Sequence, residues 1–287
     1  MIHEICFTVF ICLEYIYGKG DFCVGSKNSK IIFYVFIFLQ ILLYASFLSL
    51  DMLGIGLALS KFIKFMIIIL CFCFALLFAR GADKGILFCM KAALLFTVVS
   101  DYFLLIKDIY LYGVITFIIV QQLYGVRLIL AKLQVLEYPV TNKEKIAFGS
   151  KGGKYELLLK LYLVRLGAQA LITGLLITVF HYLRVAPNSL LCVSIFYFVS
   201  ILNNTISASL FIKNSFKVKG DILFAVGMIF FLLCDINVGI FNMSSFINLP
   251  ESVYHILYTA SSILMWTFYA PAQVLISLSS TKMTRTI

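Results

Sequence analysis

The sequence is dominated by continuous apolar runs, each about as long as a bilayer is thick. A helix needs roughly 20 apolar residues to cross the hydrocarbon core, and helix is the state that pairs backbone groups locally in lipid. The runs do not alternate in polarity, which excludes the strands of a membrane barrel. The sequence therefore predicts an all-α polytopic bundle of eight transmembrane helices. They cover about residues 31–50, 62–79, 84–106, 109–132, 155–180, 189–212, 221–243 and 254–279.

Composition excludes the soluble alternatives. Hydrophobic residues make up 62% of the 287 residues and charged residues 13%, whereas a globular domain is about 45–50% apolar and about 25% charged. Too few polar side chains remain to cover a water-exposed surface. A soluble enzyme, a coiled coil, a disordered chain and a secreted disulfide scaffold are excluded. The formal net charge of +10 does not indicate nucleic-acid binding, because the basic residues are spread between the apolar runs.

The basic residues predict an orientation. When the connections are assigned alternately to the two sides of the membrane, one side receives fifteen Lys and Arg and the other side three (Lys61, Lys107 and Arg184). Positive charge collects on cytoplasmic loops, so we expect both ends of the eight-helix bundle in the cytoplasm. The fifteen are Lys19, Lys27, Lys30, Arg80, Lys84, Lys132, Lys143, Lys145, Lys151, Lys154, Lys213, Lys217, Lys219, Lys282 and Arg285.

Two segments lie outside the main runs. Residues 1–30 form an N-terminal segment whose first part, 1–17, is apolar but carries Glu4 and Glu14. It has no basic start and no small-residue cleavage site, so it is a poor signal peptide; we interpret it as an interfacial helix, with a ninth span as the alternative. Residues 31–287 are expected to form a single transmembrane domain. The basic loop 133–154 divides this domain into two sets of four helices.

Polar residues within the spans are the candidates for function. A charge at the bilayer centre costs at least about 2.5–3.5 kcal/mol on insertion scales, and such residues usually face an interior or a cavity. The main candidates are Lys64, Lys91, Asp101, Arg127, Asp235 and Gln273, and the weaker ones are Gln121, Asn203 and Asn204.

Depth places two acids and a base near one level. At 1.5 Å per residue, Asp101 lies about 7 Å and Asp235 about 12 Å below the predicted outer edge, with Lys64 near the same level. Two neighbouring buried carboxyl groups favour a state in which one is protonated, which suits acid/base hydrolysis and equally proton-coupled transport. The structural alternative is an ion pair between Lys64 and one of the acids.

Further polar side chains share helix faces with one another. Gln121 and Tyr124 are three residues apart, and Tyr269 and Gln273 are four apart, so each pair lies on one face. These groups either line a cavity or join helices by hydrogen bonds. Lys91 lies toward the cytoplasmic half, where it either contacts a phosphate or extends to the interface.

Three stretches resemble the YhhN family of membrane proteins. KAALLFTVVSDYFLL (91–105) followed by YGVITFIIVQQLYGVRL (112–128) is similar to the family's central signature, GDILFAVGMIFFLLCDINVGIFN (220–242) to its second aspartate helix, and MWTFYAPAQVLISLS (265–279) to its last helix. The matching residues are Asp101, Gly113, Phe117, Tyr124, Asp235, Tyr269, Ala272 and Gln273, and Lys64 falls where the family often has Lys-Pro. The departures are Phe65 for Pro, Ser100 for Gly and Gln121 for His.

The resemblance implies hydrolysis of the vinyl ether bond of lysoplasmalogens, the activity of the family's animal members. It implies Asp101 and Asp235 as the acid/base pair. Lys64, Lys91, Gln121, Tyr124, Tyr269 and Gln273 are then expected to bind a lysophospholipid substrate. Carboxyl groups suit this chemistry, because protonation of the vinyl ether gives an oxocarbenium ion like that of glycosidases. We expect no metal or cofactor, and membrane lipids as the surroundings. The alternative is a proton-coupled transporter or channel that uses the same aspartates.

Overall fold

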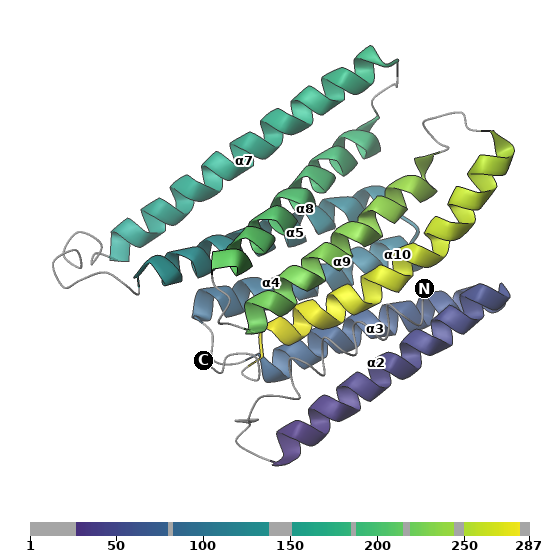
Figure 1. The fold of residues 1–287 in the computed structure, drawn as a ribbon, viewed down its shortest axis with the longest axis horizontal. Coiled ribbons are helices and arrows are strands. Elements are labelled where there is room, and N and C mark those ends of the chain that lie inside the picture. The colour runs from purple at the N-terminus through teal and green to yellow at the C-terminus, as the bar shows by residue number, and fades with distance from the viewer. Residues whose placement is uncertain are drawn as a thin grey trace. The chain divides into compact units, whose positions relative to one another are not determined.

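The computed structural model describes residues 27–79, 83–137, 151–184, 188–214, 219–243 and 250–281. These ranges contain long α helices and one short π-helical segment, η1 (Figure 1). The prediction for residues 1–17 lies outside the described residues. The elements are α2 (Lys27–Leu53), α3 (Leu57–Phe78), α4 (Lys84–Asp101), η1 (Tyr102–Ile106), α5 (Tyr110–Glu137), α7 (Lys151–Tyr182), α8 (Ser189–Asn214), α9 (Lys219–Phe241) and α10 (Glu251–Ser279).

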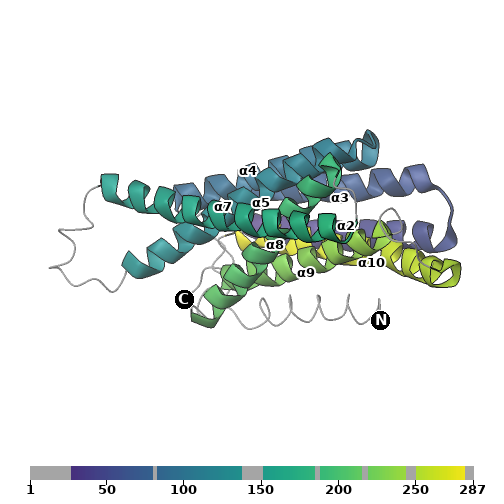
Figure 2. The same ribbon diagram turned by 90° about the horizontal axis from the view of Figure 1, so that it is seen from above.

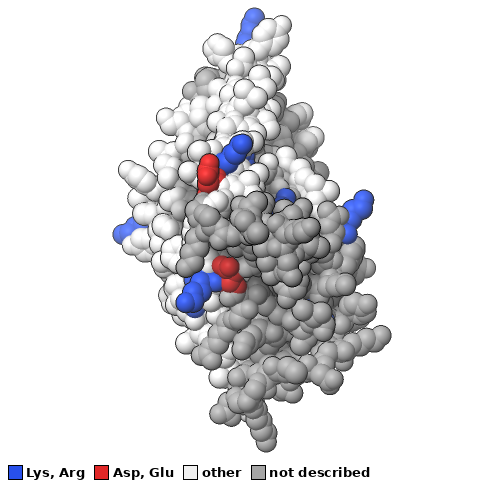
Figure 3. Space-filling model, turned by 90° about the vertical axis from the view of Figure 1, so that its left-hand side faces the viewer, with Lys and Arg blue, Asp and Glu red and all other residues white. Residues whose placement is uncertain are grey.

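Eight of the described helices are long and apolar enough to cross a membrane. This confirms the predicted all-α polytopic fold and a multi-pass integral membrane protein. Large apolar side chains remain exposed along the helices, among them Phe38, Leu171 and Ile256, as expected of surfaces that face lipid. Among the described residues on the face in Figure 3, charged side chains form small spots between uncharged residues, some with acidic and basic groups side by side.

The chain forms two compact units. One contains α2, α3, α9 and α10, and the other contains α4, η1, α5, α7 and α8 as far as Phe211. This grouping differs from the division at loop 133–154 that the sequence suggests. The reason lies in the first unit, where α10 packs on α9, α3 and α2, so that the two last helices join the two first.

A tight turn joins α2 to α3 in the first unit. Gly54 and Gly56 have φ values of +65° and +64°, a region that residues with a side chain rarely adopt. The turn reverses the chain within three residues, Gly54 to Gly56. The last turn of α2 therefore lies beside the first turns of α3.

Helices α9 and α10 lie side by side in both views (Figures 1 and 2) and approach closely at Gly227. A Cβ atom at Gly227 would lie 2.8 Å from Ile276 Cγ1 and 3.1 Å from the Ala272 carbonyl oxygen. Small residues permit such close packing of membrane helices. One turn before Gly227 on α9, Leu223 belongs to a core that also contains Leu275, Phe36 and Phe74. The rings of Phe36 and Phe74 stack there at 4.1 Å between centroids.

In the second unit, α4 changes into a π-helical turn directly after Asp101. The Lys107 amide donates to the Tyr102 carbonyl at 3.1 Å, five residues back. Ser100 Oγ donates to the Gly113 carbonyl at 2.5 Å, and Leu104 of the π turn fills the space that a side chain at Gly113 would need. Segments of π helix often occur at functional sites, and this one fixes the position of Asp101 against α5.

Candidate functional site

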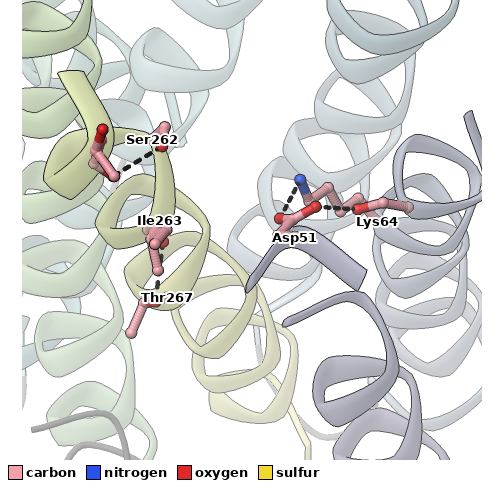
Figure 4. A network of polar contacts seen from close by, with 7 residues as sticks. Asp51, Lys64, Ser262, Ile263 and Thr267 are labelled. Atoms are coloured by element: carbon pink, nitrogen blue, oxygen red, sulfur yellow. Dashed lines mark hydrogen bonds and ion pairs between the residues drawn. The ribbon is translucent and has the colours of Figure 1, made fainter. Parts of the chain in front are cut away.

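Lys64 is the centre of the polar cluster in the first unit. Its Nζ atom lies 2.7 Å from Asp51 Oδ2, and Ser60 Oγ donates to Asp51 Oδ1 at 2.5 Å. Figure 4 shows Asp51 and Lys64 facing one another from α2 and α3. The ammonium also lies 5.5 Å from the ring centroid of Phe47 and 4.9 Å from that of Trp266, distances that favour cation–π attraction.

Local sequence explains this cluster. Ser60 and Lys64 are four residues apart and therefore share one face of α3. Asp51 lies in the last turn of α2, and the glycine turn brings it over that face. The predicted first span ends at residue 50, so Asp51 is not among the predicted site residues. The unused signal is an acid just before two glycines, with a serine and a lysine following on one helix face.

The structure pairs Lys64 with Asp51, an acid that the structural alternative above does not include. That alternative paired Lys64 with Asp101 or Asp235, and a contact with either of them stays a prediction. The short turn explains the observed pair, because it holds Asp51 beside Lys64 through local chain geometry. The role of Lys64 in binding substrate stays a prediction.

Tyr269 and Gln273 lie on α10 in the same unit, both buried. Tyr269 makes edge contacts with Trp266 and Phe231, at 5.2 and 5.4 Å between ring centroids. Gln273 is fully buried, and among the described residues neither atom of its amide has a hydrogen-bond partner. An amide left in this state is costly, which is a physical reason to expect a ligand beside it.

Asp235 is half-buried on α9. Its level follows from contacts between the antiparallel helices α9 and α10. Phe231 of α9 contacts Tyr269 of α10. Asp235 lies one turn after Phe231, and Trp266 lies about one turn before Tyr269. Because the two helices are antiparallel, both steps lead in the same direction, so Asp235 and Trp266 are at the same level. Asp235 is therefore at the level of the aromatic ring that contacts Lys64.

The other four predicted site residues belong to the second unit. Asp101 is 2% exposed at the end of α4, and Gln121 and Tyr124 are fully buried on α5. Lys91 is half-buried on α4. The predicted convergence of Asp101 and Asp235 joins residues of different units and stays a prediction.

A network of polar side chains connects α5, α7 and α8 in the second unit. Asn204 Nδ2 donates to Gln121 Oε1 at 2.8 Å, and an Arg165 guanidinium nitrogen donates to Asn204 Oδ1. One turn away, the Gln122 amide donates at 3.2 Å to the side-chain oxygens of both Gln169 and Ser200. Arg165, Gln169 and Ser200 are not among the predicted site residues. The unused signal is their spacing, since residues 165 and 169 and residues 200 and 204 are four apart.

Together these features define a multi-pass α-helical membrane protein that encloses polar side chains within each unit. No family model, curated protein or solved structure matches the chain. The resemblance to the YhhN family stays a prediction that depends on the three sequence stretches.

Proposed function

We propose that the protein is an integral membrane hydrolase of the YhhN type, which cleaves the vinyl ether bond of lysoplasmalogens. The observation that carries this proposal is Asp101, a carboxyl group 2% exposed within a predicted membrane span. Acids inside membrane spans are rare and generally mark functional sites. The π turn that follows Asp101 supports the same assignment.

The reaction needs one proton donor and one carboxylate. An acid protonates the β-carbon of the vinyl ether, which leaves an oxocarbenium ion. Water then adds to the cation, and the second carboxylate takes the proton that the water loses. The resulting hemiacetal breaks its bond to the glycerol oxygen, which gives a fatty aldehyde and a glycerophospho-base. We assign the two carboxyl roles to Asp101 and Asp235 without choosing between them, by analogy with carboxyl pairs in glycosidases.

Two features of the first unit support a ligand near Asp235. The register of α9 and α10 gives Asp235 the same level as Trp266, which contacts Lys64. Gln273 offers a fully buried amide that has no hydrogen-bond partner among the described residues. A polar substrate group beside Gln273 would satisfy that amide.

A proton-coupled transporter or channel is the second candidate. The observation that favours it is the network of Gln122, Gln169 and Ser200, because a transport path needs polar groups in the middle of the spans. Proton flux into proteoliposomes, measured with a pH-sensitive dye, tests this candidate. It requires flux that falls to the background of empty liposomes when Asp101 is replaced by Asn.

The hydrolase proposal is tested with purified protein and two lipids that differ in one bond. The protein is incubated with a lysoplasmenyl phospholipid and with the corresponding acyl lysophospholipid, and both aldehyde and fatty acid are measured. We expect aldehyde from the first lipid and no fatty acid from the second. Absence of aldehyde from folded, monodisperse protein would overturn the proposal, and fatty acid from the acyl lipid would indicate a different hydrolase.

A further inference from the structure

Arg165 holds a positive charge inside a span with a neutral partner. It lies on α7 ten residues after Tyr155, where the span begins, hence about 15 Å along the helix at 1.5 Å per residue. Its guanidinium donates a hydrogen bond to the Asn204 side chain, and its Nε atom is buried with no partner among the described residues. Arg165 is half-buried as a residue, and a partly desolvated cation with no anion beside it among the described residues is costly, so this site has the charge to hold one.

The hydrogen-bond directions show that the site presents donors. Arg165 has N–H groups only, so it fixes the Asn204 oxygen as the acceptor. The Asn204 nitrogen must then donate, and it does so to Gln121 Oε1 at 2.8 Å. This leaves Gln121 Nε2 as a further donor, which is buried and has no partner among the described residues. The hydrogen bonds thus run from Arg165 to Asn204 and from Asn204 to Gln121. At the two ends of this series, Arg165 Nε and Gln121 Nε2 are donors with no acceptor among the described residues.

Two neighbours fit the same ligand chemistry. The guanidinium lies directly on Gly125, where a Cβ atom would be 2.5 Å from its central carbon, so glycine is required for this approach. Lys132, two turns further along α5, is an exposed cation whose charge adds to the positive potential around Arg165. The second positive charge raises the electrostatic attraction for an anion with more than one oxygen.

We propose that Arg165, Gln121 and Asn204, packed over Gly125, form a binding site for the oxyanion of a phosphate ester. Convergent donors from α5 and α7 and two positive charges match phosphate oxygens, which Arg binds in a bidentate manner. The site is separate from the proposed hydrolysis, and it removes Gln121 from the substrate-binding residues that the family resemblance implies. Gly113, which binds Ser100 beside Asp101, is twelve residues from Gly125 on α5, about 18 Å along the helix. Only the glycerol backbone separates the ether bond of a lysolipid from its phosphate. A lysolipid with its ether bond at Asp101 therefore could not place its phosphate at Arg165.

Binding is measured on the full chain in a neutral detergent, by native mass spectrometry and by the shift in melting temperature. The probes are glycerol 3-phosphate, a lysophosphatidic acid, the monoacylglycerol with the same chain and the fatty acid with the same chain. We expect lysophosphatidic acid to bind and monoacylglycerol not to bind. Binding of glycerol 3-phosphate as well identifies a site for free phosphate esters, and its failure identifies a lipid head-group site. Equal binding of the monoacylglycerol, or binding of the fatty acid alone, would overturn the proposal.

Substitutions locate the binding at Arg165. Arg165→Gln should weaken lysophosphatidic acid binding roughly tenfold or more, since hydrogen bonds to charged groups contribute about 1.5–3 kcal/mol. Lys160→Gln is the matched control, because Lys160 is an exposed cation on the same helix and should leave affinity unchanged. Gly125→Ala should displace the guanidinium and weaken binding in the same direction.

Asn204→Asp separates binding from structure, including the case in which Arg165→Gln fails to fold. The new carboxylate has the same shape as the amide and lies beside the guanidinium, where it competes with the phosphate. We expect a folded protein, with a melting temperature at or above that of the wild type, whose affinity for lysophosphatidic acid is at least about tenfold lower. Unchanged affinity in this variant would show that Arg165 has a structural role only, and would overturn the proposal.

Discussion

The ammonium of Lys64 and the carboxylate of Asp51 lie 2.7 Å apart across the turn that joins α2 to α3. Their side chains are only 10% and 14% exposed, and the rings of Phe47 and Trp266 cover the ammonium. The pair thus ties the α2–α3 hairpin to α10, which carries Trp266. Asp235 is at the level of the same ring on the neighbouring helix α9.

Removal of one partner of this pair should destabilise the protein strongly. Asp51→Asn leaves a mostly buried ammonium without its counter-charge, and breaking a buried pair in this way costs about 3 kcal/mol or more. The double variant Asp51→Asn with Lys64→Met removes both charges and should recover most of that loss. Equilibrium unfolding in detergent measures the three free energies. An Asp51→Asn protein within about 0.5 kcal/mol of the wild type would contradict the structural role of the pair.

The close approach at Gly227 makes a second prediction. Gly227→Ala places a methyl group 3.1 Å from the backbone oxygen of Ala272, which cannot move aside alone, so α9 and α10 must separate. We expect a loss of about 1–3 kcal/mol, typical of overpacked sites. Gly239→Ala is the control on the same helix, since nothing lies within 4 Å of its Cβ position, and it should be neutral. Equal melting temperatures for the two variants would contradict the packing at Gly227.

The spans could be predicted from the sequence because bilayer thickness sets a length that apolar runs must reach. The ends of the helices could not, since they depend on turn chemistry. The first span is predicted to end at residue 50, but α2 continues to Leu53, where the glycine turn begins. Those few residues contain Asp51, and with it the partner of Lys64. The π turn after Asp101 was also missed, because its hydrogen bonds, such as that from the Lys107 amide to the Tyr102 carbonyl, depend on how Leu104 packs against Gly113.

The candidate site could be predicted only in part. The cost of burying polar groups singled out Lys64, Asp101, Gln121 and Gln273, all of which are buried. Spacing along a helix gives the face on which a residue lies, but not which helix packs against that face. The bond from Arg165 to Asn204 joins α7 to α8, and only the packed unit shows it. Asp235, expected in the interior, is half-buried.

Gln273 should behave differently from Gln40, the other buried glutamine of the first unit. Gln273→Leu removes an amide with no hydrogen-bond partner among the described residues, so unfolding free energy should stay the same or rise by about 1–3 kcal/mol. Gln40→Leu removes an amide that donates to the Ile67 carbonyl at 3.2 Å and to Cys71 Sγ, and should cost about 1 kcal/mol. Thermal unfolding in detergent compares the two variants. If Gln273 binds substrate as proposed, its Leu variant also loses aldehyde release. Strong destabilisation by Gln273→Leu would show that the amide has a structural role.

Asp101→Asn and Asp235→Asn should each abolish aldehyde release while the protein still folds. Asn keeps the shape of the side chain but cannot exchange a proton, and general acid or base catalysis contributes about 10²–10⁴-fold. Asp108→Asn is the control, because Asp108 is exposed and its φ of +52° is a conformation that Asn tolerates. Circular dichroism and gel filtration establish that each variant is folded. If the two acids act in one reaction, the double variant should be no slower than either single variant. Additive losses would indicate two independent sites, and full activity in either single variant would end the assignment of the pair.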